Sequence, residues 1–187
     1  MWPALVLLDR DGVINADSPD AILTPDQWQP LPGSLKAIAR LTAAEIPVVI
    51  VTNQAAIGRG RLSEETLIAI HQRLRNALAE AGGVVREIFF CPHAPNAHCG
   101  CRKPAPAMIH EALARFETPA SEAVFIGDSA RDLQAAEAAG VPAWLVRTGN
   151  GQATARNGAF AHVPVFNDLA ATVDALTAPR ATAGEPS

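Results

Sequence analysis

Short, mostly apolar segments alternate with segments of helical periodicity along this 187-residue chain. The apolar runs lie at residues 4–8, 47–51, 87–90, 123–126 and 143–146, with a weaker one at 163–166. Continuous apolar runs of this length are typical of strands buried on both faces of a sheet. Because strands that alternate with helices are joined by right-handed crossovers, the pattern predicts one α/β domain. We expect a doubly wound, Rossmann-like parallel sheet with helices on both faces.

The segments between these runs carry helix signals. The strongest begins after Ser63, a favourable N-cap, and stops at Gly82-Gly83. Further helices are predicted behind Pro32-Gly33-Ser34, over 108–116, between 129 and Gly140, and over 169–176, whereas residues 16–32 have no clear pattern. The domain should therefore span residues 1–177, and residues 178–187 should form a flexible tail.

Composition and charge narrow the classes of function. The chain is 49% hydrophobic and 18% charged, which predicts a packed core and excludes a largely disordered protein. A net charge of −4 provides no broad basic surface, so neither nucleic acid nor an anionic membrane is an expected partner. No apolar run approaches a membrane span and the N-terminus lacks a signal pattern, so we expect a cytoplasmic protein, with a monomer favoured.

Carboxylates follow two of the predicted strands. Asp9 and Asp11 come directly after the first strand, and Asp128 follows the strand at 123–126. Carboxyl ends of parallel strands meet at one edge of a sheet, where three carboxylates need compensating positive charge. Mg²⁺ and Lys103 could supply that charge, and Thr52 and Lys103 are available donors for phosphoryl oxygens. The set predicts phosphoryl transfer.

The order of these residues resembles the four motifs of the haloacid dehalogenase-like phosphatases. The matching segments are Asp9-Arg10-Asp11-Gly12-Val13-Ile14-Asn15, Thr52-Asn53, Lys103-Pro104 and Gly127-Asp128. The resemblance implies that Asp9 attacks phosphorus, Asp11 acts as general acid and base, and Thr52 and Lys103 hold the phosphoryl oxygens. It also implies that Mg²⁺ is bound by Asp9, Asp128 and the backbone carbonyl of Asp11. Asp132 is either a surface acid in the first turn of a helix or an outer partner of the metal site.

The cysteines form a separate candidate metal site. Cys91, Cys99 and Cys101 all lie within eleven residues, together with His93 and His98. Three thiols cannot all pair as disulfides, whereas three thiolates and an imidazole complete a tetrahedral zinc site with no open position. Spacing alone leaves both histidines possible as the fourth ligand, and the family resemblance favours His93. A closed site should be structural and should brace the loop that carries Lys103.

The Cys/His loop sharpens the resemblance. Together with the segment 52–60 it is similar to the D-glycero-D-manno-heptose-1,7-bisphosphate 7-phosphatases, over Leu5 to Thr148. That resemblance implies a sugar phosphate substrate, removal of its C7 phosphate, and a place in the synthesis of ADP-heptose for lipopolysaccharide or of a related nucleotide-heptose. The gaps between motifs are too short for a large cap domain, so we expect a capless enzyme whose loops select the substrate. The candidate substrate contacts are Asp17, Asn53, Gln54, Arg59 and Arg102.

Two alternatives remain open at this point. Histidinol-phosphate phosphatases resemble the chain in the same motifs and zinc loop, and their substrate's amine would need acidic neighbours such as Asp17 or Asp20. A non-enzymatic phospho-acceptor module also carries acids, a threonine and a lysine at strand ends, but it has no need of Asp11. The preferred anomer of a heptose bisphosphate is not specified by the sequence.

Overall fold

The computed structural model describes residues 2–178 and contains one six-stranded sheet in the order β3-β2-β1-β4-β5-β6. Every neighbouring pair of strands is parallel, as the alternating pattern predicts. The strands are β1 (Leu5–Leu8), β2 (Val48–Asn53), β3 (Glu87–Cys91), β4 (Ala123–Gly127), β5 (Ala143–Val146) and β6 (Val165–Phe166). The helices are α1 (Ser34–Ala43), α2 (Ala55–Gly58), α3 (Glu64–Glu80), α4 (Ala107–Arg115), α5 (Ala130–Ala138), α6 (Gly151–Ala155) and α7 (Leu169–Thr177).

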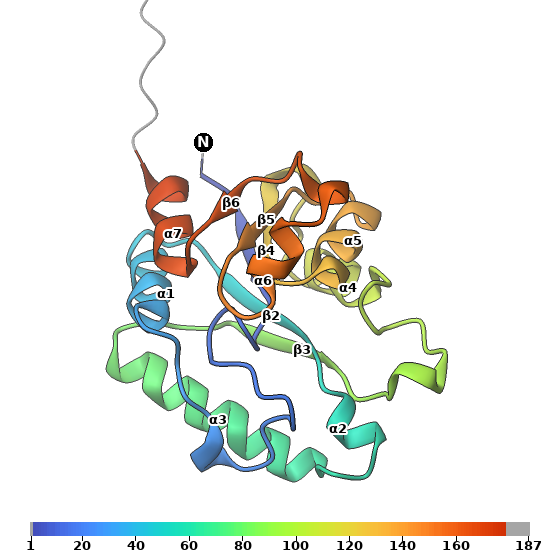
Figure 1. The fold of residues 1–187 in the computed structure, drawn as a ribbon. Helices are drawn as coiled ribbons and strands as arrows, with labels where there is room; N and C mark the ends of the chain where they lie inside the picture. The colour runs from blue at the N-terminus through green and yellow to red at the C-terminus, as the bar shows by residue number, and fades with distance from the viewer. Residues whose placement is uncertain (1, 179–187) are drawn as a thin grey trace, which may run out of the picture.

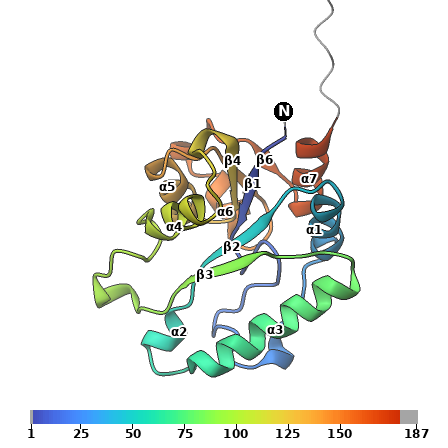
Figure 2. The ribbon, with the colours of Figure 1, turned by 180° about the vertical axis from the view of Figure 1, so that it is seen from behind.

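Helices cover both faces of the sheet, and the alternation of side chains along β1 explains how. Val6 and Leu8 pack in one core with α1, α3 and α7, while Leu5 and Leu7 pack in the other with α4 and α5. Figure 1 shows α1 and α7 on one side of the sheet and α4 and α5 on the other, and Figure 2 shows the same layers from behind. All four β1 side chains are fully buried, so the prediction of a strand covered on both faces is confirmed.

The start of α3 is determined by a local cap. The Ser63 hydroxyl accepts a hydrogen bond from the backbone N–H of Thr66 and so caps α3, as the sequence predicts. The short helices α2 and α6 were not expected. The segment 16–32 contains a helical turn at Pro25–Gln27 and an isolated β-bridge from Pro30 to Asn15, but no longer helix or strand. The predicted tail lies outside the described residues from 179 onward. No helix among residues 2–178 is both long and apolar enough to cross a bilayer.

The strand order places the candidate site. The chain runs from β1 to β2 to β3 in one direction and then returns to β4 on the other side of β1. Ligands of doubly wound sheets bind at such a switch point, beyond the carboxyl ends of the strands. Asp9 and Asp128 stand immediately after β1 and β4, at this position. Within the described residues the connection after β1 contains α1 and the connection after β2 contains α2 and α3, and neither forms a cap domain.

Candidate active site

Asp9 and Lys103 form the centre of the site. The Lys103 Nζ donates to Asp9 Oδ1 at 2.9 Å, to Asp132 Oδ1 at 2.7 Å and to the carbonyl of Val51 at 2.7 Å. The lysine is 2% exposed, yet its two carboxylate partners outweigh burial and raise its pKa. Lys103 is therefore charged, and it holds Asp9 in place from a position 12 residues beyond the end of β3.

Asp132 is a buried partner of this lysine. Its other oxygen, Oδ2, accepts from the Ser129 hydroxyl at 2.7 Å and from the backbone N–H groups of Ser129 and Asp128. Because the side chain is 1% exposed, the interpretation of Asp132 as a surface acid is wrong. Both oxygens are occupied by donors, so Asp132 orients Lys103 and the start of α5.

The Asp128 carboxylate lies between two loops. Its Oδ2 accepts from the backbone N–H of Asn150 at 2.7 Å and from the Asn150 side-chain amide at 3.2 Å. Gly12 and Gly149 line the same space with φ of +84° and +56°, and a Cβ at either glycine would clash with Asp128 Oδ2. The carboxylate is thus fixed in one orientation. Asn150 was not identified from the sequence, because nothing in its local pattern marks it.

The charges of this cluster fit a divalent cation. Asp9, Asp128 and Asp132 each offer a carboxylate oxygen within 4.8 Å of the others, and Lys103 pairs with only two of them. Three negative charges and one positive charge leave an excess of two. Burial, reinforced by Asp132, raises the pKa of Asp9 well above its ordinary value and raises that of Asp128 to about 7. A hard cation would reverse both shifts, so the donors suit Mg²⁺.

Asp11 has a different environment from Asp9. Arg10 donates to it through Nε at 3.1 Å and through Nη2 at 2.8 and 3.0 Å, and Asn15 and Gln54 add amide donors at 2.9 and 3.0 Å. Burial opposes ionisation, but the Arg10 charge and these hydrogen bonds outweigh it and lower the pKa of Asp11. Asp11 is therefore an oriented carboxylate at the edge of the cleft.

Two polar residues around β2 serve the site indirectly. Gln54 donates to the Thr52 hydroxyl as well as to Asp11, both at 3.0 Å, so it links the two. Asn53 was predicted as a substrate contact, but both ends of its amide bind the backbone of Lys103, at 3.1 Å each. Its observed contacts therefore position the lysine loop. The Thr52 hydroxyl keeps its own proton to donate, since it accepts the bond from Gln54.

A second cavity adjoins the carboxylate cluster. The first cavity, at the carboxylate cluster itself, has a volume of about 110 Å³ and is lined by Asp9, Thr52, Lys103 and Asp128. The second cavity has a volume of about 230 Å³. Asp11, Asp17, Asn53 and Arg131 line both cavities, and Arg59, Arg61 and Arg102 line the second. Arg131 escaped the sequence analysis because only the direction of α5 brings it to the cleft. Asp17, predicted as a substrate contact, lies at the shared boundary, where its carboxylate accepts from the Asn150 amide at 3.3 Å.

The Cys/His loop gathers four donor atoms. Cys91 Sγ lies 3.6 Å from Cys99 Sγ and 3.2 Å from Cys101 Sγ, and His93 Nδ1 lies 3.2 Å from Cys101 Sγ. Sulfur ligands 2.3 Å from a tetrahedral zinc ion would be roughly 3.8 Å apart, so the set fits zinc with little rearrangement. The donor atoms that lie together are those of Cys91, His93, Cys99 and Cys101, so this geometry favours His93 over His98 as the fourth donor. All three thiols are free of disulfides.

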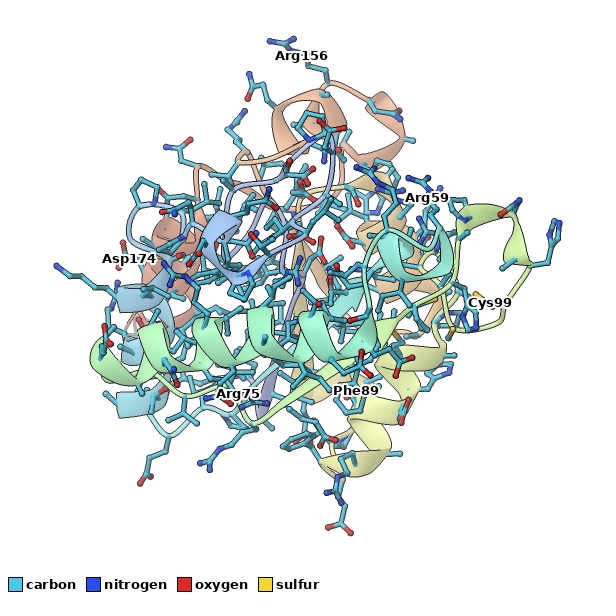
Figure 3. All side chains as sticks on the ribbon, turned by 90° about the horizontal axis from the view of Figure 1, so that it is seen from below. Arg59, Arg75, Phe89, Cys99, Arg156 and Asp174 are labelled. Carbon is cyan, nitrogen blue, oxygen red and sulfur yellow. The ribbon has the colours of Figure 1, made fainter. Side chains whose placement is uncertain are left out.

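This loop packs against α2. The Gly58 N–H donates to the carbonyl of Pro92 at 2.7 Å, and a Cβ on Gly58 would clash with the backbone of Ala94. Figure 3 shows Arg59, at the end of α2, on the same side of the molecule as Cys99 of the loop. The Cys/His loop is therefore packed on α2, which ends next to Arg59 of the second cavity, and the chain continues from this loop into the segment that carries Lys103.

Comparison with known proteins gives consistent matches. A model of the HAD-hydrolase-like family matches residues 100–172. The D-glycero-beta-D-manno-heptose-1,7-bisphosphate 7-phosphatase of Bordetella bronchiseptica is 49% identical over 173 residues, covering 92% of this chain and 97% of that protein. The enzyme of the same name from Pseudomonas aeruginosa is 45% identical, with 94% and 99% covered.

A solved structure matches equally well. The crystal structure of the D,D-heptose 1,7-bisphosphate phosphatase from B. bronchiseptica, complexed with magnesium and phosphate, has a TM-score of 0.89 and 49% identity to this chain. The match covers 92% of this chain and 97% of that one. A protein with this backbone thus binds the ion and the anion that the charges described above would accept.

Proposed function

Since this chain belongs to the heptose-1,7-bisphosphate 7-phosphatase family of HAD-like hydrolases, we propose that it removes the C7 phosphate of D-glycero-β-D-manno-heptose 1,7-bisphosphate. Its membership makes the chain a phosphatase, so the alternative of a non-enzymatic phospho-acceptor module is wrong. The observation that carries the substrate assignment is the pair of adjoining cavities, one built for phosphoryl transfer and one bordered by five arginines, of which Arg10 is paired with Asp11. The names of the relatives at 45–49% identity, which specify the β anomer, support this choice of anomer.

The two aspartates divide the chemistry. Asp9 attacks phosphorus as the bond from phosphorus to the C7 oxygen breaks, and Asp11 gives that oxygen a proton, so an aspartyl phosphate forms. Asp11 then takes a proton from the water that attacks the phosphoryl group, which releases phosphate and restores Asp9. The ionised state of Asp11 suits this second step. A bound phosphate dianion would raise the pKa of Asp11, which favours the protonated form needed in the first step.

The remaining residues hold the phosphoryl group. We assign Mg²⁺ to Asp9, Asp128 and the backbone carbonyl of Asp11, where the ion would neutralise the carboxylates and polarise a phosphoryl oxygen. The Thr52 hydroxyl faces the same cavity and would donate to another oxygen. Lys103 contributes its charge while its three protons hold neighbouring groups, so its main effect is to fix Asp9 and stabilise the transition state.

The second cavity favours an anion over an amine. Arg59, Arg61, Arg102 and Arg131 line it, against the acidic side chains of Asp17 and Asp20, while Arg10 and Asp11 neutralise each other. Arg102 is close enough to Arg131 and Arg59 that their charges, after burial, help lower its pKa. Such a group suits the C1 phosphate. The amine of histidinol phosphate would meet this positive charge, although Asp17 and Asp20 keep that substrate as a second candidate.

The Cys/His cluster bears on both the second metal and the cellular compartment. We assign a structural zinc to Cys91, His93, Cys99 and Cys101, whose four donors leave no position for a substrate. Thiolates that bind a metal persist best in a reducing compartment, which supports the cytoplasm. There the product would feed synthesis of the ADP-heptose used for lipopolysaccharide.

Phosphate release in the presence of Mg²⁺ tests the proposal. We expect kcat/KM to be highest for the β anomer of heptose 1,7-bisphosphate, lower for the α anomer and lowest for histidinol phosphate. Arg59→Met, at an arginine that lines only the second cavity, should raise KM for the bisphosphate with little change for histidinol phosphate. The exposed Arg156, which lines neither cavity, provides the matched control Arg156→Met. A preference of the wild type for histidinol phosphate would refute the substrate assignment and leave the phosphatase chemistry intact.

A further inference from the structure

Arg10 is a buried charge inside the first phosphatase motif, and the roles proposed above do not include it. It stands between the two catalytic aspartates and is 1% exposed. A buried guanidinium is costly unless its donors are paired. Its Nε and Nη2 are satisfied by Asp11, and its Nη1 points the other way, to His71 Nε2 at 3.2 Å. Asp11, Arg10 and His71 thus form a continuous chain from the cleft to the middle of α3.

The chemistry of this contact fixes the state of His71. A guanidinium can only donate, so His71 Nε2 must be the acceptor and the proton of the neutral ring must be on Nδ1. His71 is 8% exposed and shares the buried side of α3 with Leu67, Ile70, Leu74 and Leu78. Its ring packs edge-on against Phe90, with centroids 6.1 Å apart. The imidazole is therefore an immobile acceptor built into the core beneath the site.

The His71 acceptor determines the orientation of the Arg10 guanidinium. The guanidinium is planar and rigid, so fixing Nη1 also fixes the direction in which Nε and Nη2 meet the two oxygens of Asp11. We propose that His71 is a positioning residue for the general acid and base, acting through Arg10 to hold the Asp11 carboxylate at the leaving oxygen. This inference rests on the role proposed above for Asp11. It deepens that role by extending the catalytic apparatus to a helix that does not touch the substrate cavities.

Leaving groups that differ in their need for a proton test the inference. A sugar phosphate releases an alkoxide that must be protonated, whereas p-nitrophenyl phosphate releases a stable phenolate that needs no acid. Single-turnover release of the leaving group, measured with excess enzyme and Mg²⁺, isolates this step from later hydrolysis. His71→Leu removes the acceptor, and His71→Gln replaces it with an amide oxygen.

We expect His71→Leu to slow release of the sugar about 10- to 100-fold, with KM and release of p-nitrophenolate within about threefold of wild type. His71→Gln should recover most of the loss. His110→Leu, at an exposed histidine of α4, is the matched control and should behave as wild type. Equal losses with both leaving groups, an unchanged rate in His71→Leu, or no recovery in His71→Gln would each overturn the inference.

A second variant keeps the test valid if His71→Leu fails to fold. Arg10→Lys preserves the buried charge and leaves α3 unaltered, but an ammonium cannot engage both Asp11 oxygens in the plane that His71 sets. It should show the same selective loss, and a loss shared by both leaving groups would again contradict the inference. If the wild type does not hydrolyse heptose bisphosphate, the proposed substrate is wrong. The comparison of leaving groups would then use any sugar phosphate that the enzyme does hydrolyse.

Discussion

Replacement of His71 by glutamine should reduce the loss of stability on acidification. Burial, followed by the charge of Arg10, lowers the pKa of His71 to about 3, while Asp11 acts in the opposite direction and Arg75 adds to the lowering. An unfolded histidine has a pKa near 6.5. Between these two pKa values His71 is protonated in the unfolded chain and neutral in the folded chain. Its contribution therefore makes folding progressively less favourable as pH falls from 6.5 toward 3.

The size of the effect follows from the difference in pKa. pH 5 lies about 1.5 units below the pKa of the unfolded histidine, and each unit is worth about 1.4 kcal/mol. The free energy of unfolding at pH 5 is therefore lowered by about 2 kcal/mol, whereas the reduction at pH 7 is close to zero. His71→Gln has no proton to bind in either state. Its free energy of unfolding should therefore fall by about 2 kcal/mol less than that of wild type between pH 7 and pH 5.

Urea denaturation at the two pH values measures this difference. The other titrating groups are common to both proteins and cancel in the comparison, provided that the denaturant slope is unchanged. His110→Gln, at an exposed position, should follow the wild type. Identical losses of stability in wild type and His71→Gln would show that His71 is protonated in the folded protein, which would refute the assignment of its Nε2 as an acceptor.

Three further predictions concern the two metal sites. Gly12→Ala should destabilise the protein by about 2–5 kcal/mol in thermal or chemical unfolding, because φ is +84° and the new Cβ would clash with Asp128; a stable variant would contradict this packing. Asn150→Ala should raise the Mg²⁺ concentration needed for half-maximal activity about 10-fold, since it frees the Asp128 carboxylate to rotate, and an unchanged Mg²⁺ titration would count against this role. Cys99→Ser should lower the zinc content measured by elemental analysis and lower the melting temperature, while full retention of zinc would show that Cys99 is not a ligand.

The sequence was sufficient to predict the sheet and most of its helices. Continuous apolar runs such as 4–8 and 123–126 have few alternatives to a strand buried on both faces, and Ser63 marks the start of α3 through a bond made within four residues. The helices α2 and α6 were missed because they contain only four and five residues, too few for a periodic pattern. In α2 the close approach of Gly58 to the Cys/His loop provides the support that local sequence lacks.

In the active site, too, some residues could be predicted from the sequence and others only from the tertiary structure. Asp9 and Asp128 were predicted together because parallel strands bring their carboxyl ends to one edge, so position in the chain determines proximity. Lys103 lies 12 residues beyond β3 and was predicted instead as a counter-charge for these carboxylates. Tertiary structure alone decided that Asp132 is buried against Lys103, that Arg131 lines the cleft and that His71 reaches Arg10. Each of these contacts depends on the rotation of a helix about its own axis as it packs on the sheet. That rotation is set by the fit between two distant surfaces, so no short stretch of sequence contains it.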